Sequence, residues 1–344
     1  MKKKLSIVDI AKQLNVSPTT ISFILNGKAK EKRISDELAE HVLKQIEISG
    51  YKANSLAQSL RTGKTSIIGL MVENIANPFF ANVARLIEEK AYKNGYKIIY
   101  CSTANDTEKT KDLLKMLSER HVDGYIISPP EGVESDINQL IENNSPVILF
   151  DRYLPNTLAD YVGINNEEST YNATTHLITN GYKEIAFVTL DSLQSQMQDR
   201  LRGYERALAE HGLNQHVKEI SYHQTEDMIH RHIIHFFDRK KNIDAVLFST
   251  NYLGVSGLKA IREMGLRIPE DLAVVAYDDN SLFEMYSPSI TAIAQPVEDI
   301  SERLITSLLN RLNSSSKIKK AMNDVVKTTL IERSSSGIKD LSDQ

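Results

Sequence analysis

Two sets of polar side chains in this sequence have the types and the spacing to bind another molecule. Near the N-terminus, hydroxyl and amide side chains crowd the stretch from Ser17 to Asn26, where they could contact phosphate groups and base edges. Farther along, carboxylate, amide and guanidinium side chains follow apolar runs that are typical of strands. Such groups beside aromatic residues suit a small polar ligand. The apolar pattern around each set predicts the elements that position it.

Two short helices are predicted around the first set. Ser6 and Asp9 form a capping-box pattern at the start of one helix, which ends near Asn15, a residue that enters the left-handed conformation readily. Ser17 is a suitable N-cap, and Pro18 a suitable first residue, for the second helix. The inward faces of the two helices are predicted to consist of Ile7, Ile10, Ala11 and Leu14 and of Ile21, Ile24 and Leu25.

A third helix, from Ser35 to Gly50, is predicted to complete one small core with Leu38, Val42 and Ile46. This pattern predicts a helix-turn-helix, whose second helix can enter the major groove of DNA. A plain helical hairpin is the alternative. The charge pattern favours DNA, because residues 1–63 hold 11 Lys and Arg against 6 Asp and Glu, while the rest of the chain holds 30 against 39. The second helix is predicted to face outward with Pro18, Thr19, Ser22, Phe23 and Asn26.

Four stretches extend this pattern over nearly the whole chain: SIVDIAKQLNVSPTTISFILNG, NSLAQSLRTGKT, IIGLMVENIANPFF and TTLIERSSS. With them, the sequence resembles the LacI/GalR (lactose-repressor) family of bacterial transcriptional regulators. The resemblance implies that Pro18, Thr19 and Phe23 meet base edges. The full set of DNA contacts that it implies is Ser6, Ser17, Pro18, Thr19, Thr20, Ser22, Phe23, Asn26, Tyr51, Asn54, Ala57, Gln58, Leu60 and Arg61.

The segment from Asn54 to Arg61 resembles the hinge helix of that family, which folds on DNA. Leu60 matches the leucine that enters the minor groove, where an apolar wedge opens a base step. An ordinary linker leucine is the alternative. The sequence departs from the family where Phe23 replaces a common arginine and Asn15 a common glycine, so the preferred bases cannot be transferred.

From residue 66 onward, apolar runs alternate with helical patterns, which predicts a parallel α/β architecture. A break in this series around residues 161–177 indicates two similar lobes with crossings between them. The resemblance implies a core like that of periplasmic binding proteins, with an effector cleft at the carboxyl ends of the strands. The predicted strand regions are SIIGLMV, KIIYCST, DGYIIS, PVILFD, EIAFVTL, VKEIS, DAVLFS and LAVVAYDD.

The resemblance implies that residues of the second set and the aromatic residues beside them match positions at which the family contacts its effector, whereas Gln194 and Gln196 occupy the variable loop ahead of Arg200. Aromatic walls with carboxylates, amides and a guanidinium suit a sugar or a purine-like ring. The alternative for an Asp that follows a strand is a turn cap or an ion pair between the lobes. Asn165 and Tyr252 stand where the family often has Asp. The predicted effector-binding residues are Phe79, Phe80, Asp151, Gln194, Gln196, Arg200, Asn251 and Asp278.

The motifs of an enzyme or a metal protein are not met. The string GKTS at 63–66 ends like a phosphate-binding loop, but Gln58 occupies the place of the required glycine and a strand follows the string. No dinucleotide-binding glycine pattern follows the first strand. A helix with Ile229, Ile233 and Phe236 inward would spread its histidines over solvated faces, which argues against a metal site at His230, His232 and His235. We therefore expect no catalysis, no cofactor and no metal.

A solute-binding protein of sugar transport is the second alternative, since it shares the two-lobed core. It predicts an export signal and no DNA-binding unit, whereas MKKKL is followed by an amphipathic pattern without a continuous apolar stretch. The single cysteine, Cys101, excludes an internal disulfide and is predicted to be buried in a strand. We expect a cytoplasmic protein without membrane anchoring.

The predicted fold class is an all-α helix-turn-helix DNA-binding domain at residues 1–50, a hinge helix and linker at 51–65, and an α/β two-lobed core at 66–344 for effector binding and dimerisation. The predicted function is that of a repressor of carbohydrate-related genes, which binds a palindromic operator in double-stranded DNA and responds to a sugar or a related metabolite. The polar tail RSSSGIKDLSDQ lacks the leucine heptads of family tetramers, so a homodimer is expected.

Overall fold

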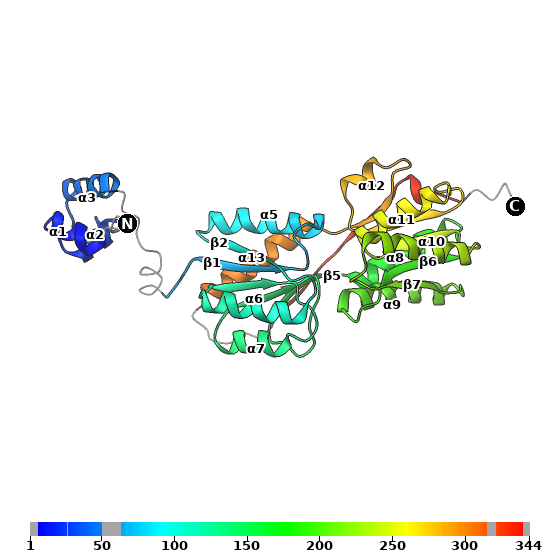
Figure 1. Cartoon of the computed structure of the whole chain (residues 1–344), viewed down its shortest axis with the longest axis horizontal. Coiled ribbons are helices and arrows are strands. Elements are labelled where there is room, and N and C mark those ends of the chain that lie inside the picture. Colours follow the sequence, from blue (N-terminus) through cyan, green and yellow to red (C-terminus); the bar gives the residue numbers. More distant parts are fainter. Residues whose placement is uncertain (1–5, 26, 50–62, 315–320, 340–344) are drawn as a thin grey trace. The chain divides into compact units, whose positions relative to one another are not determined.

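The computed structural model describes residues 6–25, 27–49, 63–314 and 321–339. The chain divides into two compact units, Met1–Thr65 and Ser66–Gln344 (Figure 1). The first unit contains helices α1 (Ile7–Gln13), α2 (Pro18–Leu25) and α3 (Asp36–Ser49).

Local side chains determine where the first two helices begin and end. The Ser6 and Asp9 side chains each accept a hydrogen bond from the backbone N–H of the other residue, which forms the predicted capping box of α1. Asn15 adopts the left-handed conformation, with φ at 51°, in the turn between the helices. Ser17 then accepts a hydrogen bond from the backbone N–H of Thr20 at 3.0 Å, as an N-cap of α2 does.

The three helices share one apolar core, as their periodicity predicts. Leu14, Leu25 and Leu38 are half-buried and pack against this core. The fully buried members are Ile10, Ala11, Ile21, Ile24, Val42 and Ile46.

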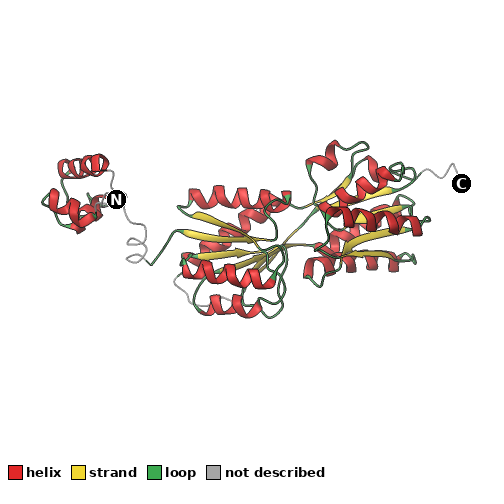
Figure 2. Cartoon of the chain, in the orientation of Figure 1, coloured by secondary structure: helices red, strands yellow, loops and turns green. Residues whose placement is uncertain are grey.

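The second unit consists of two lobes, each built on one six-stranded sheet with helices on both faces (Figure 2). All strand pairs in the first lobe are parallel. In order across the sheet, its strands are β11 (Asn323–Val326), β5 (Asp160–Ile164), β4 (Val147–Phe150), β3 (Gly124–Ile127), β1 (Ile67–Val72) and β2 (Lys97–Ser102). Its helices are α5 (Pro78–Lys93), α6 (Thr107–Glu119), α7 (Glu134–Glu142) and α13 (Val297–Leu312).

The second lobe repeats this plan, except that its edge strand β12 (Thr329–Ile331) pairs antiparallel with β10 (Thr291–Ala294). The other strands, which continue across the sheet from β10, are β9 (Ala273–Tyr277), β8 (Ala245–Phe248), β6 (Ile185–Leu190) and β7 (His216–Ile220). Its helices are α8 (Asn166–Thr179), α9 (Ser195–Glu210), α10 (Glu226–Arg239), α11 (Asn251–Glu263), α12 (Ser281–Met285) and the 3₁₀ turn η1 (Ser334–Ser336).

The chain crosses between the lobes three times: from β5 to α8, from β10 to α13 and from β11 to β12. Three crossings leave the lobes joined by short segments side by side (Figure 1). The carboxyl ends of the parallel strands of both lobes border the space between them, where the predicted ligand-binding residues lie.

All eight predicted strand regions form strands, and the predicted crossing is confirmed. Four strands, β5, β10, β11 and β12, were not predicted. Residues 160–164 were assigned to the break in the series, yet they form β5 before the chain crosses. The other three strands have only three or four residues, and two of them, β11 and β12, are largely exposed edge strands without a continuous apolar run.

Candidate functional sites

The first candidate site is the N-terminal end of α2. Ser17, Pro18 and Thr19 are exposed there, as predicted, and the hydroxyls of Ser17 and Thr20 lie 2.8 Å apart. The N-terminus of a helix offers unpaired backbone N–H groups and a positive dipole end, both of which suit a phosphate. This end of α2 therefore combines hydroxyl donors with an electrostatic preference for anions.

Phe23 is not the freely exposed side chain that the outward face of α2 predicts. It is half-buried, and the Lys32 ammonium group lies 5.6 Å from the centre of its ring. A cation over an aromatic face is attracted by the ring quadrupole. Lys32 also forms an ion pair with Glu31 at 2.8 Å, so its charge is balanced locally. Ser22 is half-buried as well, and the Ser6 hydroxyl takes part in the capping box of α1.

Half of the predicted DNA contacts cannot be placed. They lie outside the described residues: Asn26, Tyr51, Asn54, Ala57, Gln58, Leu60 and Arg61.

The second candidate site is the cleft between the lobes of the second unit. Seven of the eight predicted effector-binding residues line one cavity of about 30 Å³, here named the inner compartment. The eighth, Asn251, lines a neighbouring cavity of about 520 Å³, here named the outer compartment. Glu73, Asn77 and Tyr252 line both compartments. The structure therefore brings the predicted residues together, but the space among them has the size of a water molecule.

Two aspartates occupy equivalent places in the two lobes. Asp151 directly follows β4, and Asp278 directly follows β9. Both adopt the left-handed conformation, with φ at 67° and 64°. Non-glycine residues rarely adopt it, and such residues cluster at functional sites. Both carboxylates line the inner compartment.

Asp278 is held by groups of its own lobe. Its Oδ1 accepts a hydrogen bond from Gln295 Nε2 at 2.6 Å. Burial raises the pKa of the Asp278 carboxyl, and Asp151 raises it further, whereas Arg200 and Gln295 lower it. The balance favours the protonated acid more than in an exposed aspartate.

Arg200 is buried on α9 and is bonded to its surroundings. Its Nε donates to Asn166 Oδ1 at 2.9 Å, and its Nη1 donates to the carbonyl oxygen of Ser249 at 2.7 Å. The guanidinium carbon lies 3.5 Å from the centre of the Tyr277 ring. Gly203 permits this arrangement, because a Cβ there would lie 2.1 Å from the Glu167 carbonyl oxygen and would push α8 and α9 apart.

Arg152 forms a second buried cluster. It donates to Asp151 Oδ2 at 3.0 Å, to Asn105 Oδ1 at 2.6 Å and to Glu73 Oε2 at 2.6 Å. An ion pair between the lobes was one alternative for an Asp that follows a strand. Asp151 does form an ion pair, but its partner is Arg152 of the same lobe. Burial lowers the pKa of Arg152, but the carboxylates of Asp151 and Glu73 outweigh it, and the net shift is upward.

Two phenylalanines and two glutamines are the other predicted residues that line the inner compartment. Phe79 and Phe80 pack edge to face at 5.1 Å, and Phe80 packs against Phe150 at 6.1 Å, so both rings belong largely to the core. Gln196 Nε2 donates to Gln194 Oε1 at 3.2 Å. Among the described residues, the buried Gln196 Oε1 has no hydrogen-bond partner.

Hydrogen bonds across the cleft hold the lobes together. Asn251 Nδ2 in the second lobe donates to Asn77 Oδ1 in the first at 3.0 Å. The backbone N–H of Tyr153 donates to Ser195 Oγ at 3.0 Å, and the Ser195 hydroxyl donates to the Tyr153 carbonyl at 3.1 Å. These contacts explain why the inner compartment is so small.

The outer compartment is lined by residues that were not predicted for the site from the sequence. Tyr222 and Tyr252 provide aromatic faces, and Gln224 and Glu73 provide acceptors. Tyr222 and Gln224 follow β7 in a polar loop, and Glu73 follows β1. Their position directly after a strand could have identified them, but residues after strands were predicted as effector contacts only where they match the family.

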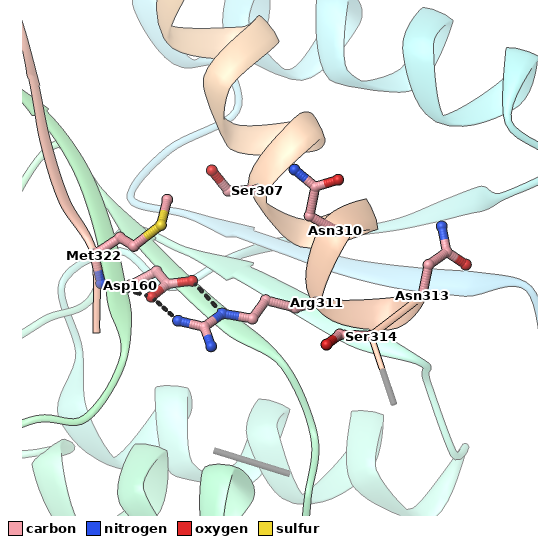
Figure 3. Close-up of a pocket in the computed structure, with 7 residues that line it drawn as sticks. All are labelled: Asp160, Ser307, Asn310, Arg311, Asn313, Ser314 and Met322. Atoms are coloured by element: carbon pink, nitrogen blue, oxygen red, sulfur yellow. Dashed lines mark hydrogen bonds and ion pairs between the residues drawn. The ribbon is translucent and has the colours of Figure 1, made fainter. Parts of the chain in front are cut away.

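A third cavity, of about 390 Å³, lies at the C-terminal end of α13 in the first lobe (Figure 3). Its centre is the ion pair of Arg311 with Asp160, in which two nitrogen atoms contact both carboxylate oxygens at 2.5 and 2.7 Å. Asp160 also accepts from the backbone N–H of Met322 at 2.8 Å. None of the predicted site residues lies there.

The histidine-rich helix α10 buries Ile229, Ile233 and Phe237, whereas Phe236, which was predicted to face inward, is half-buried. His230 lies 3.3 Å from Glu263. Within the described part of the chain, no group of three or more His, Cys, Asp or Glu side chains could hold a metal ion. Cys101 is buried in β2. None of the described helices is long and apolar enough to span a bilayer.

Comparison with known proteins follows the same division of the chain. Residues 6–54 match the model of bacterial regulatory proteins of the lacI family, and residues 174–336 match the model of a periplasmic binding protein-like domain. An HTH-type transcriptional repressor PurR of Aliivibrio fischeri is 32% identical over 316 residues, which cover 89% of this chain and 91% of that protein.

Two solved structures illustrate the likeness in fold. The lac repressor dimer bound to operator and the anti-inducer ONPF matches with a TM-score of 0.85 at 21% identity, over 97% of this chain and 100% of that one. A periplasmic binding protein/LacI transcriptional regulator of Alkaliphilus metalliredigens, complexed with D-xylulofuranose, matches with a TM-score of 0.72 at 25% identity, over 79% and 99%.

Proposed function

Because the chain belongs to the LacI family of bacterial transcriptional regulators, we propose that it is a ligand-responsive repressor of carbohydrate-related genes. The observation that supports this most is the combination of an N-terminal helix-turn-helix unit with a two-lobed core whose cleft is lined by polar groups. A solute-binding protein of transport would have only the second of these parts.

On the DNA side, the proposal assigns residues 1–50 to the operator half-site and 51–65 to a hinge helix and linker. Thr19 and Phe23 would set the preferred bases, and Leu60 would open the central base step. The exposed N-terminal end of α2, where the Ser17 and Thr20 hydroxyls lie 2.8 Å apart, supports this assignment. Two copies in a homodimer would grip a palindromic site.

On the ligand side, the proposal assigns the effector to the cleft of the core. The relative with bound D-xylulofuranose supports a sugar or a related metabolite. A ligand shifts a conformational equilibrium only through its different affinity for the two states. Since hydrogen bonds across the cleft hold the lobes together, an effector would act by favouring or opposing this closure and so change operator affinity.

The test separates the two units. The full chain should select specific fragments from genomic DNA, and its affinity for them should fall steeply with salt concentration, because binding by lysine and arginine releases counterions. A fragment that begins at Ser66 should fold, as judged by circular dichroism, and should not bind the selected DNA. If this fragment bound the same DNA as tightly as the full chain does, the assignment of DNA binding to residues 1–65 would be wrong.

A further inference from the structure

The cleft carries an excess of negative charge. Four carboxylates line the two compartments, and they belong to Glu73, Asp151, Glu226 and Asp278. Glu226 is exposed and paired with Lys259, and two guanidinium groups, those of Arg152 and Arg200, accompany the other three, which leaves a formal excess of one negative charge. A ligand that brings a further negative charge into such a site is repelled.

Neither guanidinium group is placed to offset this repulsion. Arg152 donates to three acceptors of the first lobe, and one of these is Glu73. Arg200 donates to Asn166 and to the Ser249 carbonyl, and its flat face lies over the Tyr277 ring. Binding an anion through either one would require breaking hydrogen bonds that satisfy buried groups, which costs free energy.

Two polar atoms that belong to residues lining the compartments lack a hydrogen-bond partner in the described part of the chain, and both are acceptors. Gln196 Oε1 in the inner compartment and Gln224 Oε1 in the outer one are buried without a hydrogen-bond partner in the described part of the chain. A buried acceptor without a donor is costly, so a ligand that supplies donors gains affinity at both places. Hydroxyl groups supply such donors without adding charge.

Glu73 contributes both to the repulsion of anions and to the binding of hydrogen-bond donors. It is 7% exposed and lines both compartments. Its Oε2 accepts from Arg152 at 2.6 Å and from Asn105 at 2.8 Å, so the carboxylate is fixed in the wall that the compartments share. Tyr222 and Tyr252 flank it from the second lobe. A ring lying on these tyrosines would present its polar edge to Glu73.

We propose that Glu73 sets the charge specificity of the cleft, and that the effector is an uncharged, hydroxyl-rich compound whose ring lies in the outer compartment. The inner compartment, at about 30 Å³, admits one polar substituent of that ring. The outer compartment, at about 520 Å³, has the size of a small-molecule site. Phosphate esters and acids of the same compound are excluded. This inference rests on the proposed ligand-responsive function.

The experiment measures binding of matched ligands to the full chain by calorimetry. The probes are D-glucose, D-galactose, D-ribose, D-xylose, maltose and cellobiose, each beside its phosphate ester or uronic acid. We expect at least one uncharged sugar to bind and its anionic counterpart to bind at least about tenfold more weakly, because like charges repel in a desolvated site. The proposal is overturned if no uncharged sugar binds, or if an anionic form binds as tightly as its parent.

Variants test the role of Glu73 itself. Glu73→Gln keeps the shape and removes the charge, so the discrimination between the two forms should narrow several-fold. Glu226→Gln at the exposed rim is the matched control, because it removes a carboxylate that is paired with Lys259 and leaves the buried cluster of Arg152 intact, so the discrimination should narrow less than in Glu73→Gln. If folded Glu73→Gln discriminates as the wild type does, or if Glu226→Gln narrows the discrimination as much, Glu73 does not set it.

A second pair of variants tests the placement of the ring. Gln224→Leu should weaken binding of the uncharged sugar about tenfold, since a hydrogen bond is lost in the outer compartment. Gln139→Leu, on the exposed surface of α7, is the matched control and should bind like the wild type. Equal affinity in both variants would contradict the placement.

Operator binding is measured on the same samples, so that the two proposals fail separately. A ligand that changes operator affinity but is anionic overturns only the inference about charge. A sugar that binds as expected while the protein binds no DNA overturns only the proposed repressor function.

Discussion

At the scale of single residues, the cleft combines strained backbone with buried polar groups. Asp151 and Asp278 follow strands of different lobes in the same left-handed conformation. Arg200 and Arg152 are buried beside them and are satisfied by groups of the protein. Such an arrangement keeps the polar groups in place before a ligand arrives, so that little conformational entropy is lost on binding.

Replacing Arg200 tests this arrangement. Arg200→Ala leaves Asn166 and the Ser249 carbonyl without their donor and removes the group that lies over Tyr277. We expect the free energy of unfolding to fall by about 1–3 kcal/mol and the thermal response to effector to be lost. Chemical denaturation with and without ligand measures both. Arg202→Ala, on the exposed side of the same helix, should change either quantity little; equal losses in the two variants would contradict the role given to Arg200.

The raised pKa of Asp278 predicts a pH dependence. Because the folded state holds the pKa above its ordinary value of 3.8, the charged form costs stability at neutral pH, and this cost disappears as the pH falls through the folded pKa. Asp278→Asn removes the charge and still accepts from Gln295. The variant should therefore have a higher melting temperature than the wild type at pH 7, and the difference should shrink as the pH falls toward 4.

Asp271 provides the control of opposite sign. Hydrogen bonds from Arg267 lower the pKa of Asp271 to about 2. Its charged form stabilises the folded state above the ordinary pKa, and this contribution is lost as the pH falls from 3.8 toward 2. Asp271→Asn should thus be less stable than the wild type at pH 7. The same sign for both variants would contradict the assigned shifts.

At the scale of elements, the position and the bounds of α2 are determined by the residues at its ends and by the core on which it packs. Ser17 caps it, Asn15 turns the chain before it, and Ile21 and Ile24 are buried. Its first turn is left exposed, with Thr19 at the surface. The helix is therefore held rigidly from one side while its N-terminal end is available to DNA.

Thr19→Ala tests this end of α2. If Thr19 contacts a base edge, the substitution should weaken binding to the selected operator by about 1–3 kcal/mol and relax the preference at one half-site position. Fluorescence anisotropy against a set of single-base operator variants measures both. Ser118→Ala, an exposed hydroxyl on the core, should bind like the wild type; an unaltered base preference in Thr19→Ala would exclude direct base contact.

At the scale of the core as a whole, two lobes are joined by three crossing segments and held by polar contacts across the cleft. The Asn77–Asn251 contact borders the ligand compartments, whereas the Tyr153–Ser195 contact lies away from their linings. Closure can thus be changed at Ser195 without replacing a residue that lines either compartment.

Ser195→Ala removes both hydrogen bonds to the Tyr153 backbone, each worth about 1 kcal/mol. We expect the ligand-free protein to shift toward an open arrangement of the lobes, and effector affinity to fall several-fold because closure is less favourable. X-ray scattering of the core should show a larger radius of gyration without ligand than in the wild type. A variant with unchanged scattering and affinity would show that this contact does not control closure.

Features that depend on neighbouring residues could be predicted from the sequence. Ser6 and Asp9 cap a helix three residues apart, Asn15 turns the chain, and Asp151 and Asp278 follow apolar runs that form strands. Propensity, capping and periodicity act over one or two turns, so these features can be identified without knowing the fold. The family resemblance added which strand ends converge, and the comparisons confirm the fold it implied.

Contacts between residues of distant segments depend on the tertiary fold. Arg152 meets Glu73 across 79 residues, and Asn251 meets Asn77 across 174. The edge strand β11 pairs with β5 only because the chain returns to the first lobe after β10. No local pattern encodes these meetings, since they depend on three crossings and on how closely two lobes pack. For the same reason, the sequence identified seven residues of the inner compartment but could not show that the larger space lies beside it.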